Sequence, residues 1–277
     1  MGNSFLTYRS GRWLWISSAS AMGLILHYFF IYQSRTVAYG GSVEGLLYGV
    51  AGTGLIAVLM YLGIRRRSYA SSTGTLQGWV SAHVYLGLLT LLVIPMHAGF
   101  RFGWDVHTLA FVLLVVVVFS GVVGLFLYRN IPGRLTRYEA GQQADKIDPE
   151  MARLLSDMRA LVKDKSDVLV QIYKEEVATS QQRAPKGWSL LLKGQGSDLL
   201  AVRSADLAKK VSAIPPEDQA TFQIISQLLL KKTQLEVNLL RQMQLRNALQ
   251  AWLYIHVPVS IAMVFAVGLH LIVVFLY

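Results

Sequence analysis

Five stretches of mostly apolar residues, each long enough to cross a lipid bilayer, constrain the fold of this chain more than any other feature. A helix needs roughly 20 such residues to span the hydrocarbon core, where every backbone polar group must be bonded within the segment. Only 15% of the residues are charged, against about a quarter in soluble proteins. We therefore expect five transmembrane helices, at about 13–33, 43–64, 79–99, 107–128 and 252–277.

The charged residues are concentrated between the fourth and fifth apolar stretches. Residues 131–250 hold 18 of the 26 basic and 14 of the 16 acidic residues. This segment is predicted to face water. The expected organisation is therefore four transmembrane helices in 1–130, a helical insert in 131–250 and a fifth transmembrane helix in 251–277. The predicted fold class is an all-α integral membrane bundle with a cytoplasmic helical insert between its fourth and fifth helices.

Arginines at the ends of the apolar stretches predict the orientation, because cytoplasmic loops are enriched in Lys and Arg. Two arginines, Arg35 and Arg101, would lie on one side of the bilayer and eight on the other. The eight are Arg9, Arg12, Arg65, Arg66, Arg67, Arg129, Arg134 and Arg137. We expect the N-terminus and the insert in the cytoplasm and the C-terminus outside, in a bacterial inner membrane. The net charge of +10 then reflects orientation rather than a nucleic-acid partner.

The chain contains no cysteine. Covalent haem attachment through a CxxCH motif, iron–sulfur clusters held by cysteine, and disulfides are therefore all excluded. Any redox chemistry must use other ligands.

Two apolar segments carry a histidine at each end with the same spacing. HVYLGLLTLLVIPMH runs from His83 to His97, and HVPVSIAMVFAVGLH runs from His256 to His270. In an α-helix a separation of 14 residues falls about 40° short of four full turns and rises roughly 21 Å. Each pair therefore lies on one helix face, with one histidine near each side of the membrane.

The third and fifth spans run in the same direction if the insert does not cross the bilayer. His83 is then level with His256, and His97 is level with His270. A single intramembrane histidine is more often a hydrogen-bonded contact between helices than a ligand. Four histidines in register on two parallel spans favour two b haems, each held by one facing pair of imidazoles.

On these two His-x13-His motifs the sequence resembles the di-haem membrane b-type cytochromes. This grouping includes the cytochrome b561 type, the b subunits of quinol-oxidising complexes and the ferric-reductase-like domains. The resemblance covers about 43–128 plus 252–277. The chain departs from the large bc-complex cytochromes, since it lacks a PEWY motif and has too few spans, and it carries an insert of about 120 residues before the last helix.

The resemblance implies electron transfer across the membrane, between a quinone pool and a redox partner. The one glycine cluster of the insert, GQG at 194–196, lacks the GxGxxG spacing of a dinucleotide site and the strand before it. We therefore expect a non-autonomous subunit of a quinone-linked oxidoreductase complex. Its partners would be the lipid bilayer, quinone or quinol, and iron–sulfur, flavin or multihaem cytochrome subunits.

Other residues of the spans are candidates for contact with the haems. Gly87, Gly121, Gly124 and Gly268 could let a flat macrocycle approach the backbone, although glycine is also common where membrane helices pack together. Arg101 lies one turn past His97 and could pair with a haem propionate. The alternative for Arg101 is an interfacial anchor.

His27 and His107 are the two remaining histidines. A third haem or a quinone on the outer side would use them, and Trp104 is a further candidate for the quinone headgroup. Alternatively, each histidine is a polar residue near the membrane interface whose hydrogen bonds are satisfied, and the tryptophan is an interfacial anchor. Asp105 is expected to cap the fourth span.

Helical periodicity and breakers divide the insert. One amphipathic helix is predicted from a cap at Asp148 to about Val177, followed by the loop QQRAPKG. A shorter helix should begin at Ser197 or Asp198 and end near Val211. A last helix should start at Pro215–Pro216 and run without a break into the fifth span. This insert either docks a partner beside the inner haem or braces an assembly.

Two functions from other classes compete with the cytochrome. A proton or ion transporter could use the histidines as relay groups, but such pathways usually also contain intramembrane carboxylates. Outside the insert the acidic residues are Glu44 and Asp105, both at span boundaries. A structural anchor for peripheral subunits would leave the register of the four histidines unexplained.

Overall fold

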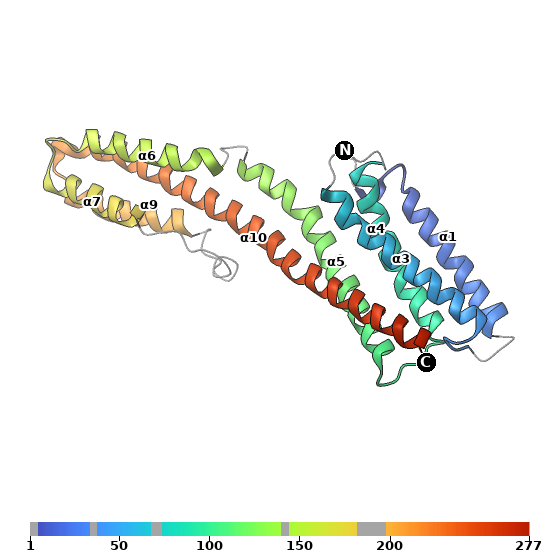
Figure 1. Ribbon diagram of the computed structural model, residues 1–277. Coiled ribbons are helices and arrows are strands. Elements are labelled where there is room, and N and C mark those ends of the chain that lie inside the picture. Colours follow the sequence, from blue (N-terminus) through green and yellow to red (C-terminus); the bar gives the residue numbers. More distant parts are fainter. Residues whose placement is uncertain (1–4, 34–37, 68–73, 140–143, 182–197, 277) are drawn as a thin grey trace. The chain divides into compact units, whose positions relative to one another are not determined.

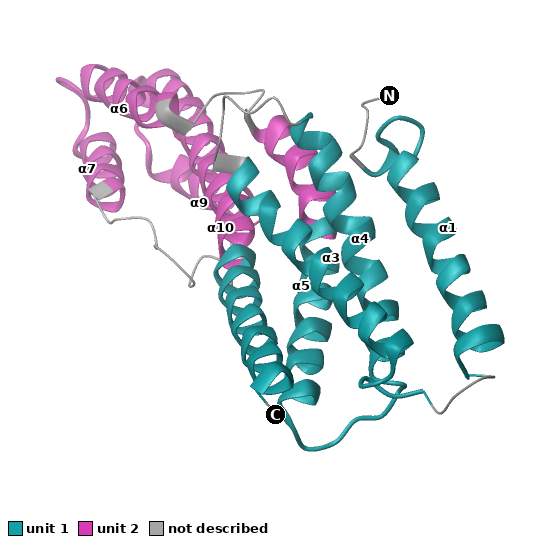
Figure 2. Ribbon diagram, turned by 45° about the vertical axis from the view of Figure 1, so that its right-hand side comes forward, with its two compact units in different colours: residues 1–125, 252–277 teal, residues 126–251 magenta. Residues whose placement is uncertain are grey.

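The computed structural model describes residues 5–33, 38–67, 74–139, 144–181 and 198–276. These residues form helices, turns and connecting loops, and no β-strand occurs among them (Figure 1). The chain divides into two compact units. Unit 1 comprises residues 1–125 and 252–277, and unit 2 comprises residues 126–251 (Figure 2).

Five helices are long and apolar enough to cross a membrane, which confirms the predicted number of spans and indicates an integral membrane protein. The fourth span is longer than predicted, since its helix continues into the insert, whereas a helix running unbroken into the fifth span was expected. The spans belong to α1 (Arg12–His27) with the π-helical turn η2 (Tyr28–Tyr32), α3 (Val43–Arg67), α4 (Leu76–His97), α5 (Val106–Glu139) and α10 (Gln219–Leu276).

In unit 1, α4 packs against both α1 and α3 (Figure 1). One apolar cluster joins α1 and η2 to α3 and α4, and is made of Tyr28, Tyr32, Tyr48, Leu89, Val93 and Met96. A second cluster joins α3, α5 and α10 through Ile56, Leu114 and Met263. These two clusters place the histidines of α4 and α10 in the same bundle.

Local signals fix both ends of α4 and the start of α5. The Thr75 hydroxyl accepts a hydrogen bond from the Gly78 amide at 3.2 Å and caps α4. The helix ends at His97, and Gly99 follows with φ +60°. A Cβ on Gly99 would lie 2.2 Å from the Ala38 carbonyl oxygen, so only glycine fits there. Asp105 caps α5 by accepting from the Thr108 amide at 2.9 Å, as predicted.

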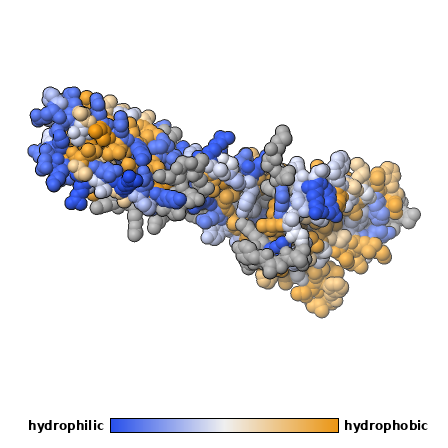
Figure 3. Space-filling model, turned by 90° about the horizontal axis from the view of Figure 1, so that it is seen from above, coloured by the Kyte–Doolittle hydropathy of each residue, from blue (hydrophilic) through white to orange (hydrophobic). Residues whose placement is uncertain are grey.

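Unit 2 is a helical assembly with its own apolar core. It contains α6 (Ala144–Leu161), α7 (Asp167–Gln181), α9 (Leu199–Lys210), the short helices η3 (Val211–Ala213) and η4 (Pro216–Asp218), and the first part of α10. On the face of unit 2 seen in Figure 3, hydrophilic residues surround a smaller patch of hydrophobic ones. The core consists of Met158, Val162, Leu169, Ile172, Leu207, Ile214, Phe222, Ile225 and Leu229.

The prediction of one helix from 148 to 177 is wrong. Two helices, α6 and α7, occupy this region, and α6 begins at Ala144, before the expected cap at Asp148. The chain turns between them at Asp164, which has φ +61°. The Ser166 amide then donates to the Asp218 carboxylate at 3.0 Å, so a long-range bond holds the turn.

The other predictions for the insert have mixed outcomes. A helix does follow Asp198, as α9, and α10 runs unbroken from Gln219 into the fifth span, so both predictions are confirmed. The loop QQRAPKG lies, apart from Gln181, outside the described residues, as does the GQG cluster.

A buried ionic network ties α7, α9 and α10 together inside unit 2. The Lys232 ammonium donates to the Glu176 carboxylate at 2.7 Å, and their side chains are only 2% and 5% exposed. Arg203 also pairs with Glu176, and Glu236 also pairs with Lys232. Each buried charge therefore has an opposite charge beside it, as burial of ions requires.

Candidate functional site

The first histidine level consists of His83 on α4 and His256 on α10, which line one cavity of about 100 Å³ in unit 1. The cavity wall is otherwise almost entirely apolar and comes from α3, α4, α5 and α10. Gly87 and Gly121 are part of it, and a Cβ added to Gly87 would meet nothing within 4 Å. The structure thus brings together two of the four predicted ligands and two of the predicted glycines.

His83 is oriented by the backbone of α3. Its Nδ1 lies 3.2 Å from the Leu59 carbonyl oxygen. A carbonyl oxygen can only accept, so Nδ1 must carry the proton and Nε2 keeps its lone pair. A ligating histidine commonly has its second ring nitrogen held in this way.

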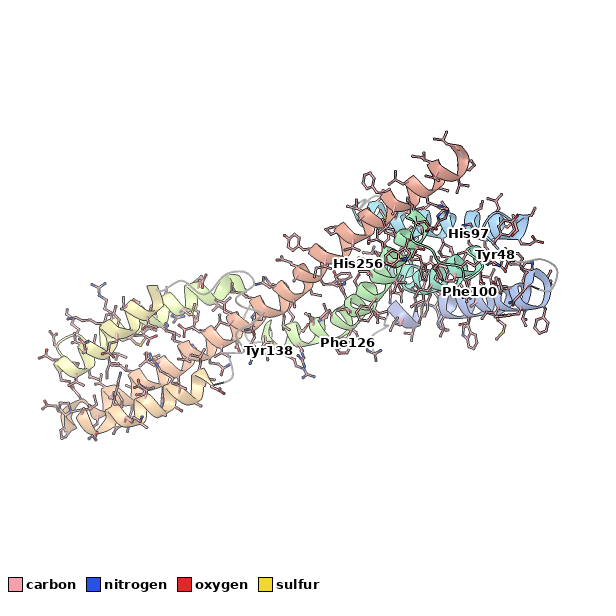
Figure 4. All side chains as sticks on the ribbon, turned by 90° about the horizontal axis from the view of Figure 1, so that it is seen from below. Tyr48, His97, Phe100, Phe126, Tyr138 and His256 are labelled. Carbon is pink, nitrogen blue, oxygen red and sulfur yellow. The ribbon has the colours of Figure 1, made fainter. Side chains whose placement is uncertain are left out.

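His256, labelled in Figure 4, is held by side chains of α5 and of its own helix. Its Nδ1 lies 2.7 Å from the Ser120 hydroxyl, which itself donates to the Val117 carbonyl at 2.8 Å. The hydroxyl therefore accepts from Nδ1, which again leaves the lone pair on Nε2. The ring of Trp252 stacks on His256 with centres 5.0 Å apart, and its indole N–H donates to the Ser120 carbonyl at 2.7 Å.

The second histidine level consists of His97 at the end of α4 and His270 on α10. Their ring centres are 6.0 Å apart, with an angle of 66° between the planes. A metal–imidazole bond of about 2 Å on each side of one ion places two opposed ring centres about 6 Å apart. The separation of this pair therefore matches two ligands of one metal.

Glycines of α3 make room for the ring of His97, which is labelled in Figure 4. The Nδ1 of His97 lies 2.7 Å from the Gly45 carbonyl oxygen, which fixes the proton on Nδ1. A Cβ on Gly49 would lie 2.8 Å from both Nδ1 and Cε1 of the same ring. A Cβ on Gly40, just before α3, would lie 3.3 Å from Cε1 and 3.5 Å from Nε2 of this ring. Any side chain at position 49 would therefore displace the imidazole.

His107 joins the second level from the first turn of α5. Its ring centre is 4.2 Å from that of His270, and its Nδ1 lies 3.6 Å from the Asp105 carboxylate. Among the described residues, the Nδ1 of His270 is buried without a hydrogen-bond partner. His270 is thus the one predicted ligand whose second nitrogen is not anchored.

His27 lies at the end of α1 and bonds to α3 rather than to another histidine. Its Nδ1 is 2.8 Å from the Tyr48 hydroxyl, which also lies 3.4 Å from the Leu24 carbonyl. Tyr48 packs with Tyr28 and Tyr32, so His27 borders an aromatic cluster. This arrangement satisfies the ring nitrogen with a protein hydroxyl.

The remaining predicted residues lie at the edges of the site. Arg101 and Trp104 are exposed in the loop between α4 and α5. A Cβ on Gly124 would lie 2.2 Å from the indole of Trp252, so Gly124 contacts the first level through this tryptophan. Gly268 is half-buried on α10, and a Cβ there would meet nothing within 4 Å.

Sequence reasoning missed the residues that orient the imidazoles. Trp252 stands one helical turn before His256, so its position on the same face was readable from spacing. Gly45 and Gly49 form a GxxxG pattern, which marks a close approach between membrane helices. Ser120 gives no such signal, because a serine in a span usually bonds its own helix.

The donor set fits a haem held by two neutral imidazoles at each level. Three of the four histidines have Nδ1 held by an acceptor and Nε2 left as a ligand atom. Among the described residues no group of three or more His, Asp or Glu side chains could hold a bare metal ion. The cavity is smaller than the roughly 300–1,000 Å³ of ligand sites, so flexible wall residues such as Met60, Leu88 and Met263 would have to move.

Comparisons with models of known protein families, with curated proteins and with solved structures found no match for this chain.

Proposed function

We propose that the chain is a membrane cytochrome b subunit that carries electrons across the bilayer through two bis-histidine b haems. His83 and His256 would hold one haem, and His97 and His270 the other. The observation that carries this proposal is that three of these four imidazoles share one tautomer, with the proton on Nδ1. Each donates through Nδ1 to an oxygen and so presents Nε2, the ligand atom, at one of two levels along α4 and α10.

When bound, each haem supplies a one-electron couple. The protein's own contribution is to fix the axial ligands and their basicity. The Leu59 and Gly45 carbonyls and the Ser120 hydroxyl accept hydrogen bonds from the Nδ1–H groups of His83, His97 and His256, which raises the donor strength of each imidazole. The apolar wall of the first level excludes water and thereby influences the reduction potential.

The chain would work as one subunit of a quinone-linked complex in a bacterial inner membrane. Quinone or quinol would exchange electrons at one side, and an iron–sulfur, flavin or multihaem cytochrome partner at the other. By the positive-inside rule the insert would lie in the cytoplasm and the C-terminus outside. The insert shares the continuous helix α10 with His256 and His270, so a partner docked there is connected to both levels.

Haem content of single-histidine variants tests the proposal. The purified protein should show a b-type spectrum after dithionite reduction, with two haems per chain as their pyridine complex. Replacing His83, His97, His256 or His270 by alanine should each remove one haem, whereas His27→Ala should remove none. A folded protein that binds no haem when made with ample haem, or a His97→Ala protein with full content, would contradict the assignment.

One observation favours a second candidate, a proton relay. His97, His270, His107 and Asp105 form a chain of titratable groups at one end of the bundle. The ring centres are 6.0 Å apart for His97 and His270 and 4.2 Å apart for His270 and His107, and the Nδ1 of His107 lies 3.6 Å from the Asp105 carboxylate. A relay through the whole membrane would need further groups, but the only carboxylate in the span of α3 is Glu44 in its first turn, and the span of α5 and the second half of α10 contain none. Proton flux into vesicles of the haem-free protein would favour this function.

A further inference from the structure

Five arginines gather in unit 2 where α5 leaves its apolar stretch and α10 approaches its own. Arg129, Arg134 and Arg137 are exposed on the last three turns of α5. On α10, Arg246 is exposed and Arg241 half-buried. The sequence contains no Asp or Glu between 106 and 138, and none after 236. Glu139, two residues after Arg137, is the first acidic residue beyond this stretch of α5. The five arginines, named here the arginine cluster, therefore form a region of predominantly positive charge.

A hydrogen bond sets the register between the two helices inside unit 2. The Gln242 side-chain amide donates to the Tyr138 carbonyl at 3.3 Å, and the helices run in opposite directions (Figure 1). Arg137 and Arg241 each precede these partners by one residue. One turn closer to the apolar stretches, Arg134 and Arg246 share a level, since each lies four residues from its partner.

Helix length places the cluster at the depth of lipid headgroups. From Val106 to Tyr128 α5 has no charged residue except histidine, and these 23 residues extend about 34 Å, close to the thickness of the hydrocarbon core. The headgroup region adds about 5–8 Å on each side. Arg129 lies at its boundary, and Arg134 follows within about 8 Å. Arg137 lies about 12 Å beyond Arg129, just outside this region, from where its long side chain can extend back toward the headgroups.

We propose that the arginine cluster binds the phosphate groups of anionic phospholipids in the leaflet on the side of the insert. The planar guanidinium matches a phosphate with two parallel N–H bonds. Arginines in rows on two helices can bind more than one phosphate at a time. An anionic leaflet offers many phosphate groups side by side. Each arginine near such a surface strengthens binding by roughly fivefold. The proposal depends on the membrane spans but not on haem.

Spin-labelled lipids test the proposal on the full chain reconstituted in phosphatidylcholine vesicles. Labelled phosphatidylglycerol should show a larger motionally restricted fraction than labelled phosphatidylcholine. The triple variant R134Q/R137Q/R241Q should lose this preference by tenfold or more, while R134K/R137K/R241K should keep most of it. The matched control R153Q/R159Q/K163Q removes the same charge from exposed positions in and just after α6 and should leave the preference unchanged.

Three results would overturn the proposal. Equal restriction of both lipids in the unmodified protein would show that no preference exists. An equal loss in the α6 control would show a general effect of net charge. Displacement of labelled phosphatidylglycerol by inorganic phosphate, but not by chloride at the same ionic strength, would assign the cluster to a free phosphate compound instead.

Discussion

At the scale of single residues, Gly49 controls the position of His97 most directly. A methyl group at Gly49 would overlap the imidazole at 2.8 Å, a distance that Cβ atoms do not adopt. His97 would have to turn away from the Gly45 carbonyl. The second level would then lose both its geometry and its anchored tautomer, while the first level on the same helices would not be touched.

We therefore expect Gly49→Ala to lose the haem of the second level and keep that of the first. The matched control is Gly54→Ala on the same helix, where an added Cβ meets nothing within 4 Å. This control should keep both haems and gain up to about 1 kcal/mol of helix stability. Pyridine-haem quantification and thermal unfolding of both proteins would measure this. Full haem content in Gly49→Ala would contradict the role given to α3.

The histidines proposed as ligands could be found from the sequence because equal spacing on two apolar helices is visible there. The groups that orient them were mostly not predictable. Leu59 and Gly45 act through backbone carbonyls, which every residue has, so no residue type marks them. The contact between His107 and His270 depends on how the loop before α5 folds back, which periodicity does not describe.

At the scale of helices, apolar length and proline positions predicted the spans and the continuous helix α10. The break between α6 and α7 was missed because the apolar period continues from Met158 to Leu169 across it. The interruption depends on Asp164 in a left-handed conformation and on a bond to Asp218, more than 50 residues away. On α10, Leu228, Leu235 and Leu249 belong to a row of residues seven positions apart. Gln242 interrupts this apolar row, and its buried amide donates to the Tyr138 carbonyl.

The pair Glu176–Lys232 should be sensitive to the loss of one partner. Lys232→Met leaves a buried carboxylate with Arg203 alone, and should lower the opening free energy of unit 2 by roughly 3 kcal/mol. Glu176→Leu combined with Lys232→Met removes both buried charges and should cost less than the single change. Hydrogen exchange of peptides from α7 and from residues 219–240 in the full-length protein would measure these differences.

Lys231→Met is the control for this cycle. Lys231 is 56% exposed and pairs with Glu150 at 2.8 Å at the surface, so its loss should cost at most about 1 kcal/mol. Equal losses of opening free energy in Lys231→Met and Lys232→Met would mean that burial does not determine how much the Glu176–Lys232 pair contributes to stability.

At the scale of the whole molecule, stability should fall in acid. Hydrogen bonds from Lys231 and Lys210 hold the pKa values of Glu150 and Glu175 below their usual 4.5. A carboxyl whose pKa is lower in the folded state stabilises the fold above its unfolded pKa, and this contribution is lost as the pH falls through the folded value. Urea midpoints of the full chain should therefore be lower at pH 4 and below than at pH 7, with a weaker dependence in E150Q/E175Q. An identical pH dependence in that variant would exclude these two carboxyls as its cause.

Because α10 is unbroken, an insertion in it changes both the position along the axis and the rotation about the axis of every residue that follows. Each residue inserted between Leu249 and Trp252 would turn everything that follows by 100°, so one extra residue would rotate His256 and His270 away from α4 relative to the insert. Seven extra residues would restore nearly the same phase, about 20° short of two turns. Because α10 is continuous helix at this junction, the rotation of His256 and His270 about the helix axis is linked to that of residues 219–249 on the same helix. Variants with insertions or deletions between Leu249 and Trp252 should therefore keep the orientation of His256 and His270 only when the change in length is close to a whole number of helical turns.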